Sequence, residues 1–178
     1  MKARPLFQSF KTSLVLLAVI GVATFAIPAS SAETPEVGAA KIGKPLVLKF
    51  KAVDGREVDL SKLKGKVVLV DFWATWCGPC MQELPNVKAA YDKLHDKGFE
   101  IVGISFDKKK EALNYVLKKE KMEWPQYFDG RGWENRIGEK SGIESIPTMW
   151  LIDRKGNLRD MNARKGLTAQ VEKLLAEK

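Results

Sequence analysis

Two cysteines, Cys77 and Cys80, are the only thiols in this 178-residue chain, and they lie three positions apart. Pro79, between them, fits the first turn of a helix, where a backbone N–H has no partner to lose. Residues three apart on a helix face the same side, with Cβ atoms about 5–6 Å apart, a separation that a disulfide tolerates with modest adjustment. Cys77 then lies at the helix N-terminus, where free N–H groups and partial positive charge favour a thiolate. The spacing therefore predicts dithiol–disulfide chemistry.

A structural disulfide and a metal site are the alternatives for this cysteine pair. A loop closed over so few residues removes little chain entropy, so the pair is a poor structural crosslink. Zinc usually takes four ligands, and the chain offers no further cysteine and a single histidine, His95. We therefore predict a redox pair, with no metal and no cofactor.

The first 32 residues have the pattern of a secretory signal peptide. Residues 1–11 carry basic side chains and no acid, residues 14–27 are apolar, and small residues lead to a cleavage site after Ala32. The apolar part is shorter than the roughly 20 residues of a membrane span, although an uncleaved anchor is the alternative. No cysteine follows within the leader, which excludes a bacterial lipoprotein anchor. We expect an extracytoplasmic protein in an oxidising compartment, where disulfides are common.

The chain carries a formal net charge of +8. Its lysine runs at 108–110 and 118–121 flank an amphipathic pattern and are most simply a solvated helix face. Because there is no arginine-rich patch and no interleaving of aromatic residues, we expect no nucleic-acid partner. Beyond the leader, the sequence predicts a flexible linker at 33–43 and one folded domain at 44–178, acting as a monomer.

Hydrophobic periodicity and turn residues divide the domain into alternating strands and helices, and the pattern predicts an α/β layered domain with a mixed sheet. Pro85 should kink the first long helix, because it cannot bond to the carbonyl of Met81, and Gly98 should end it. The predicted elements are a strand at 45–53 with a hairpin return at 56–59, strands at 66–74, 99–106, 125–128, 148–153 and 158–161, and helices at 78–97, 108–122, 134–140 and 167–178.

Asp71 interrupts the apolar run of the strand that leads to the cysteines. A carboxylate buried there is costly unless it is partnered or protonated, and burial should raise its pKa. That would make Asp71 a candidate proton acceptor for Cys80. The alternative from the residues alone is an outward-facing strand residue.

The segment from Asp71 to Cys80 resembles the active-site segment of the thioredoxin superfamily almost residue for residue. Pro85 falls where thioredoxins have their helix-kinking proline, and the segment 145–148 resembles the loop that carries the family's cis-proline. The leader, the first hairpin, the extra helix and strand at 108–128, and Glu83 three residues after Cys80 are similar to the TlpA/ResA branch of extracytoplasmic thiol-disulfide oxidoreductases. The resemblance implies a thioredoxin-like fold: a central mixed β-sheet flanked by helices, with an N-terminal hairpin and a central helix–strand insertion.

The resemblance also assigns roles around the cysteines. It implies that Glu83 lies near the pair and adjusts thiol acidity, whereas a glutamate in an early helical turn is ordinarily solvated and helps the helix dipole. An X–Pro bond is usually trans, but the resemblance implies a cis bond at Pro147 that exposes the backbone of Ile146 to an extended substrate.

The sequence also predicts the positions or roles of several tryptophans and of Asp71. Trp76 is expected to present an exposed flat surface beside Cys77, and with Gly78 and Pro79 to contact substrate. Cytoplasmic thioredoxin pairs its buried aspartate with a lysine on the next central strand, but residues 99–106 contain none, so the role of Asp71 is expected to be shared with Glu83. The remaining tryptophans, Trp73, Trp124, Trp133 and Trp150, are expected to be packing residues.

The function predicted from these features is reduction of protein disulfides. Cys77 attacks a target disulfide, and Cys80, expected to be the less exposed thiol, attacks Cys77 and releases the reduced target. The Gly–Pro dipeptide is that of thioredoxin, a strong reductant, and the resemblance implies disulfide-containing substrates such as apocytochrome c and a thiol-type membrane electron donor. The alternatives are a disulfide-forming oxidase, a binding module with incidental thiols, and a peroxiredoxin-type peroxidase, against which Val70 and Ala74 stand at positions where peroxidases need other residues.

Overall fold

The computed structural model describes residues 34–177. The predicted signal peptide, residues 1–32, lies outside this range. Among the helices of residues 34–177, none is both long enough and apolar enough to cross a membrane.

The main sheet has five strands in the order β6-β5-β4-β7-β8. Its centre, β4, runs parallel to β5 and antiparallel to β7, while β6 is parallel to β5 and β8 is antiparallel to β7. The sheet is therefore mixed, which confirms the predicted α/β class. The strands are β4 (Val67–Trp73), β5 (Phe99–Ser105), β6 (Gln126–Tyr127), β7 (Thr148–Ile152) and β8 (Leu158–Asp160).

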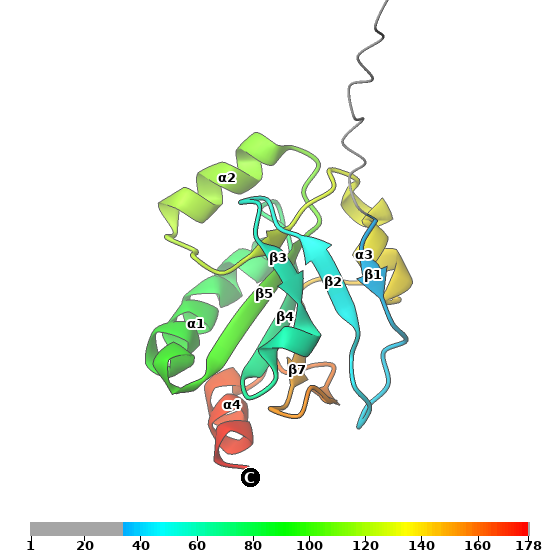
Figure 1. Cartoon of the computed structure of the whole chain (residues 1–178). Helices are drawn as coiled ribbons and strands as arrows, with labels where there is room; N and C mark the ends of the chain where they lie inside the picture. Colours follow the sequence, from blue (N-terminus) through cyan, green and yellow to red (C-terminus); the bar gives the residue numbers. More distant parts are fainter. Residues whose placement is uncertain (1–33, 178) are drawn as a thin grey trace, which may run out of the picture. The chain divides into compact units, whose positions relative to one another are not determined.

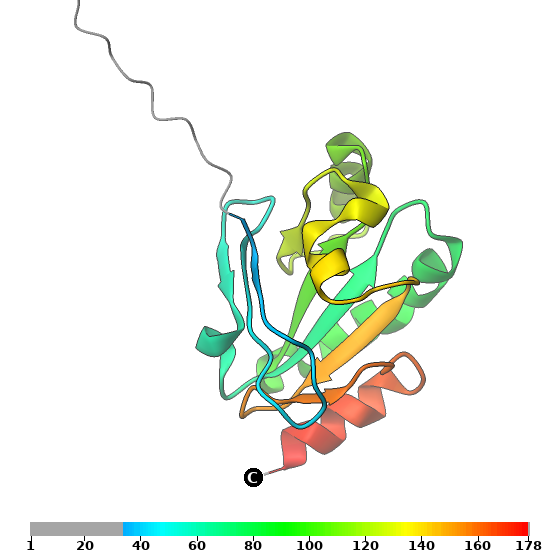
Figure 2. The same cartoon turned by 90° about the vertical axis from the view of Figure 1, so that its right-hand side faces the viewer.

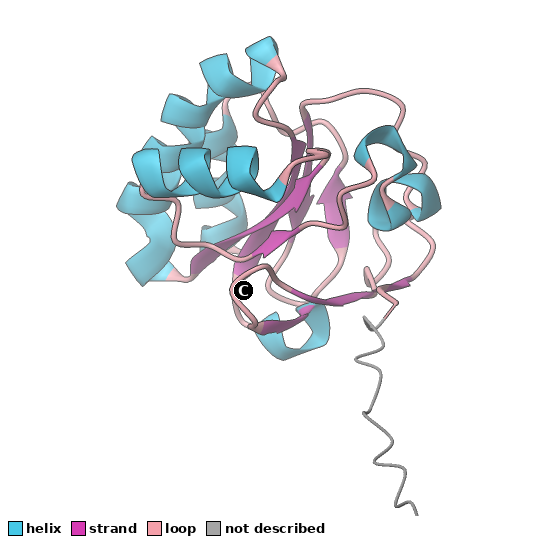
Figure 3. Cartoon of the chain, turned by 90° about the horizontal axis from the view of Figure 1, so that it is seen from above, coloured by secondary structure: helices cyan, strands magenta, loops and turns pink. Residues whose placement is uncertain are grey.

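Helices lie on both sides of this sheet (Figures 1 and 3). The long helix predicted at 78–97 is α-helical as far as Leu94 and continues as a 3₁₀ turn before Gly98, whose φ of 98° needs the left-handed freedom of glycine. The helices are α1 (Gly78–Leu94), α2 (Lys110–Lys119), α3 (Arg136–Lys140) and α4 (Leu167–Ala176), with 3₁₀ turns η1 (Leu60–Leu63), η2 (His95–Lys97) and η3 (Gly132–Glu134).

A second, three-stranded sheet consists of β1 (Glu36–Val37), β2 (Leu48–Lys51) and β3 (Glu57–Asp59), and it lies to one side of the main sheet (Figure 2). The predicted hairpin is present as β2 and β3. The segment 33–43 was predicted to be a flexible linker, but part of it forms β1. Val37 packs against the core and Gly38 N–H donates to Val47 C=O at 2.8 Å, pairings that a short run of small residues does not reveal in the sequence.

The central strand β4 is buried along its whole length, because β5 and β7 flank it and helices and loops cover both faces. Phe72 stacks edge-on against Trp150 with ring centroids 5.0 Å apart, and Trp73 Nε1 donates to Gln126 Oε1 at 2.9 Å. The carboxyl end of β4 leads directly into the cysteine pair. The most firmly held strand of the sheet therefore positions the candidate site.

Candidate functional site

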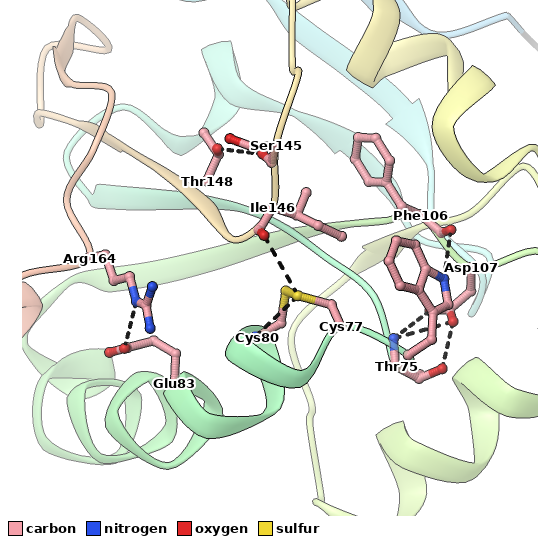
Figure 4. Close-up of a disulfide and its surroundings, with 11 residues drawn as sticks. Thr75, Cys77, Cys80, Glu83, Phe106, Asp107, Ser145, Ile146, Thr148 and Arg164 are labelled. Atoms are coloured by element: carbon pink, nitrogen blue, oxygen red, sulfur yellow. Dashed lines mark hydrogen bonds and ion pairs between the residues drawn. A yellow bond between two sulfur atoms is a disulfide. The ribbon is translucent and has the colours of Figure 1, made fainter.

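Cys77 and Cys80 form a disulfide at the N-terminus of α1, with Cα atoms 5.2 Å apart (Figure 4). Cys77 is the N-cap of the helix, and its sulfur accepts a hydrogen bond from Cys80 N–H at 3.2 Å. Pro79 lies in the first turn, as predicted, where the chain needs no N–H donor. In the reduced protein the same N–H group and the positive end of the helix would stabilise a Cys77 thiolate.

The two cysteines have the same exposed fraction, 5% each. The prediction that Cys80 is the less exposed residue is therefore not met in the disulfide state. The reason is the neighbouring loop, which brings the Ile146 carbonyl oxygen to 3.8 Å from Cys77 Sγ and covers the outer sulfur. Gly78 and Pro79, between the cysteines, are exposed.

The Ile146–Pro147 peptide bond is cis, as the resemblance predicted. Thr148 Oγ1 donates to Ser145 C=O at 2.7 Å and closes the loop behind the proline. Both Ile146 and Pro147 are half-buried, so the loop presents backbone beside the disulfide. Its role in holding substrate stays a prediction.

Asp71 lies in the middle of β4 and is 4% exposed, which excludes the outward-facing alternative. Its Oδ1 has no hydrogen-bond partner. Burial, and to a smaller extent the charge of Glu83, raise the pKa of Asp71 to about 7. An unpaired carboxyl group with a pKa in this range can take up and release a proton near neutrality, which is what a proton acceptor for a thiol requires.

Glu83, one turn after Cys80, is also buried, with 9% exposed, so it is not the solvated helix residue of the alternative. Its two carboxylate oxygens accept from Asn86 Nδ2 and Arg164 Nε, each at 3.0 Å. Arg164 comes from the loop after β8, 81 positions along the chain. Sequence reasoning missed Arg164, because nothing in a lone loop arginine identifies a partner so distant.

Asp107 is a second buried aspartate near the motif, 1% exposed, and it too was missed. Its carboxylate accepts from Thr75 N–H, Thr75 Oγ1 at 2.6 Å and Ser105 Oγ at 2.8 Å. It ties the loop before Cys77 to the end of β5. The sequence did contain a signal, because polar residues at the carboxyl ends of adjacent parallel strands meet at one edge of a sheet.

The tryptophans divide into buried and exposed groups. Trp73, Trp124 and Trp150 are at most 3% exposed, which confirms them as packing residues, and Trp76 is 54% exposed, as predicted. Trp133 was predicted to be a packing residue, but this is wrong, since it is 48% exposed. It lies on the 3₁₀ turn η3, and its ring centroid is 6.1 Å from that of Trp76, another exposed residue, so the ring packs at the surface and not in the core.

The residues around the disulfide offer no metal site. Within residues 34–177, no three histidine, cysteine or acidic side chains cluster closely enough to hold a metal ion. The arrangement instead joins a disulfide, a cis-proline loop and two buried carboxylates, a set suited to electron and proton transfer between thiols.

Comparisons with known proteins identify the family of the chain and its fold. The redoxin family model matches residues 26–175. The thiol-disulfide oxidoreductase ResA of Oceanobacillus iheyensis is 30% identical over 155 residues, which cover 85% of this chain and 79% of that protein. ResA of Bacillus thuringiensis is 33% identical over 106 residues, 60% of each chain, so this chain spans about 60% of the length of the first curated relatives that it matches.

A solved structure gives the same result for the fold. The thioredoxin domain of a thiol-disulfide oxidoreductase from Bacteroides vulgatus superposes with a TM-score of 0.65 at 28% sequence identity. The superposition covers 79% of this chain and 99% of that domain. The thioredoxin-like architecture predicted from the sequence is thereby confirmed.

Proposed function

This chain belongs to the redoxin family, in its thioredoxin-like TlpA/ResA branch, and from that premise we propose that it is an extracytoplasmic thiol-disulfide oxidoreductase that reduces protein disulfides. The observation that carries the proposal is the Cys77–Cys80 disulfide at the start of α1, with the cis-proline loop on its outer side and buried Asp71 and Glu83 nearby.

The first step is an exchange at Cys77. In the reduced protein its thiolate attacks one sulfur of the target disulfide, so the Cys77–target S–S bond forms and the target S–S bond breaks. The second target sulfur leaves as a thiolate and takes a proton from water. The free N–H groups at the start of α1 would stabilise the attacking thiolate, and we expect the backbone of Ile146 to pair with the bound target.

The second step uses Cys80 and the carboxylates. Asp71, with its pKa raised to about 7, accepts the Cys80 thiol proton as the new thiolate attacks Cys77 Sγ. The Cys77–target bond breaks, the first target sulfur leaves as a thiolate, and the Cys77–Cys80 disulfide re-forms. Two electrons have then passed from the protein to the target, and a dithiol donor must return two electrons to the protein.

We infer the partners of this reaction from membership of the TlpA/ResA branch. We propose disulfide-containing extracytoplasmic proteins, with apocytochrome c as one candidate, as substrates, and a membrane dithiol protein as the electron donor. A reductant in an oxidising compartment needs such a donor, because each turnover leaves Cys77 and Cys80 as a disulfide that persists in that compartment until a dithiol reduces it.

The direction of electron flow is tested by the reduction potential. Equilibration of the Cys77–Cys80 couple against glutathione should give a value toward the thioredoxin end of the scale, about −270 mV. A value near that of a disulfide-forming oxidase, about −120 mV, would overturn the assignment as a reductant.

Catalysis by the pair is tested by trapping. The Cys80→Ser variant should accumulate a mixed disulfide with its target on Cys77, while the matched Cys77→Ser variant should accumulate none. Target binding that continues unchanged in both variants, with no covalent complex in either, would instead support a binding module with incidental thiols.

A further inference from the structure

A hollow of about 310 Å³ opens at Trp76, the residue before Cys77, and neither cysteine nor Glu83 lines it. It lies between the loop before Cys77, the start of α2 and the turn η3. None of the steps proposed for the redox reaction uses it. The residues that matter for its chemistry are Trp76, Phe106, Lys108, Lys109, Ala112 and Trp133.

The walls of the hollow are aromatic and apolar. Trp76 and Trp133, half-exposed, have ring centroids 6.1 Å apart, and the Trp133 ring also meets Phe106 edge-on at 5.2 Å. Trp76 Nε1 donates to Phe106 C=O at 3.3 Å, which fixes one wall in position. Two large aromatic rings left together in water on an otherwise well-packed domain indicate a surface that is covered by another molecule.

The rim of the hollow is positive. Lys108 and Lys109 line it, both are exposed, and neither makes an ion pair within residues 34–177. The one carboxylate in the lining is Asp107, which is 1% exposed and already accepts hydrogen bonds from Thr75 and Ser105. The exposed carboxylates nearest in sequence, Glu111 and Glu134, do not line the hollow. The site therefore combines an apolar interior with free cations at its edge.

We propose that this hollow binds the polypeptide segment that flanks the target disulfide, and that it selects segments carrying an aromatic or large aliphatic side chain with acidic residues beside it. The inference rests on the proposed reductase function and names its substrate class. Trp76 is covalently next to Cys77, so a segment seated in the hollow lies beside the sulfur that attacks.

Charge favours this occupant over a second copy of the chain. The chain carries a net charge of +8, and two copies meeting at this face would bring lysines against lysines. An acidic segment instead gains attraction at the rim while its apolar side chain leaves water inside the hollow.

The test uses four cyclic peptides of equal length, each closed by one disulfide. Beside one cysteine they carry tryptophan with two aspartates, tryptophan with two lysines, alanine with two aspartates, or alanine with two lysines. Their reduction by the dithiol form of the protein is followed by chromatography, with hydroxyethyl disulfide as a small reference substrate. At low salt, the tryptophan–aspartate peptide should be reduced at least about fivefold faster than either the tryptophan–lysine or the alanine–aspartate peptide. The charge preference should shrink as salt is added.

Substitutions in the lining of the hollow separate the preference for acidic residues from the preference for tryptophan. Lys108→Glu combined with Lys109→Glu should reverse the charge preference, and Trp133→Ala should remove the preference for tryptophan, each measured as a ratio to the reference substrate. Matched controls lie on α2, outside the lining of the hollow: Lys118→Glu with Lys119→Glu, and Tyr115→Ala, a residue that is 66% exposed. These controls should keep the preferences of the unchanged protein.

Equal rates for the four peptides, or preferences that the hollow variants leave intact, would overturn the inference while leaving the reductase function standing. Failure to reduce even hydroxyethyl disulfide would instead overturn the proposed function on which it rests. Concentration-dependent dimerisation abolished by Trp133→Ala would assign the surface to a second copy and also overturn the inference.

Discussion

Asp71, on β4, and Asp107, just after the neighbouring strand β5, are both buried, yet their surroundings differ. Asp107 is held by Thr75 and Ser105, whose N–H and hydroxyl groups satisfy its carboxylate. Asp71 has an oxygen with no partner, and the pKa of its carboxyl group is raised to about 7. In the view of Figure 4, the Asp107 network lies on one side of the disulfide and the Glu83–Arg164 pair on the other. Burial alone therefore does not indicate a role: a carboxylate whose oxygens accept hydrogen bonds fixes a loop, whereas one without a partner is available to exchange a proton.

The largest expected effect is on the pH dependence of stability. In the folded protein the pKa of Asp71 is raised above its ordinary value of 3.8, because burial favours the protonated form. Its contribution to the free energy of unfolding is therefore fully present below about pH 4 and is lost as the pH rises to about 7. A difference of about three pKa units corresponds to about 4 kcal/mol. Urea unfolding of the oxidised protein from pH 4 to 8 should show this loss, and Asp71→Asn should not. Parallel curves for the two proteins would remove the distinction between the aspartates.

The next effect concerns Asp107. Asp107→Ala leaves the Thr75 and Ser105 donors buried without an acceptor, which should lower the free energy of unfolding by about 3 kcal/mol. Asp107→Asn keeps an acceptor oxygen and should cost clearly less. Urea unfolding at pH 7 measures both variants, and an alanine variant as stable as the parent would contradict the structural role.

The rate of the Cys80 step should depend on Asp71 and hardly at all on Asp107. Asp71→Asn removes the proposed proton acceptor and should slow the attack of Cys80 on the mixed disulfide by about a hundredfold, or about 2.7 kcal/mol. Asp107→Asn should change this rate by less than about twofold. Quenched-flow measurement of target release checks both. Similar rates in the two variants would mean that Asp71 takes no part in the proton transfer.

The smallest expected effect concerns Arg164, the ion-pair partner of Glu83. Arg164→Gln removes the cation that balances the charge of Glu83, so that charge should raise the pKa of Asp71 further, and the pH profile of the Cys80 step should move up by about half a unit. Arg164→Lys keeps the charge and should restore most of the shift. Arg159→Gln is the matched control, because it breaks an arginine ion pair with Asp153 elsewhere in the fold. An unchanged pH profile of the Cys80 step in Arg164→Gln would show that Asp71 and Glu83 act without Arg164.

Much of this molecule could be predicted from local sequence. Strand and helix patterns and the pair at 77 and 80 rest on periodicity and spacing within a few residues. The resemblance decided the burial of Asp71, which the residues alone left open, and the cis bond at Pro147. The features that were missed depend on distant partners: Glu83 with Arg164, Thr75 with Asp107, and β1 with β2. The exposure of Trp133 was missed for a related reason, since a single residue carries no local sign of how deeply its turn is packed.

The position of β4 at the centre of its sheet has a consequence for turnover. Every residue of this strand is bonded to neighbours on both sides or enclosed by the core, and Cys77 follows it after only three residues. Such strands open only in the rarest fluctuations of a protein. The Cys77–Cys80 disulfide therefore follows a strand that stays folded through repeated redox cycles. We expect the surrounding loops, and not this strand, to adjust to targets of different shape.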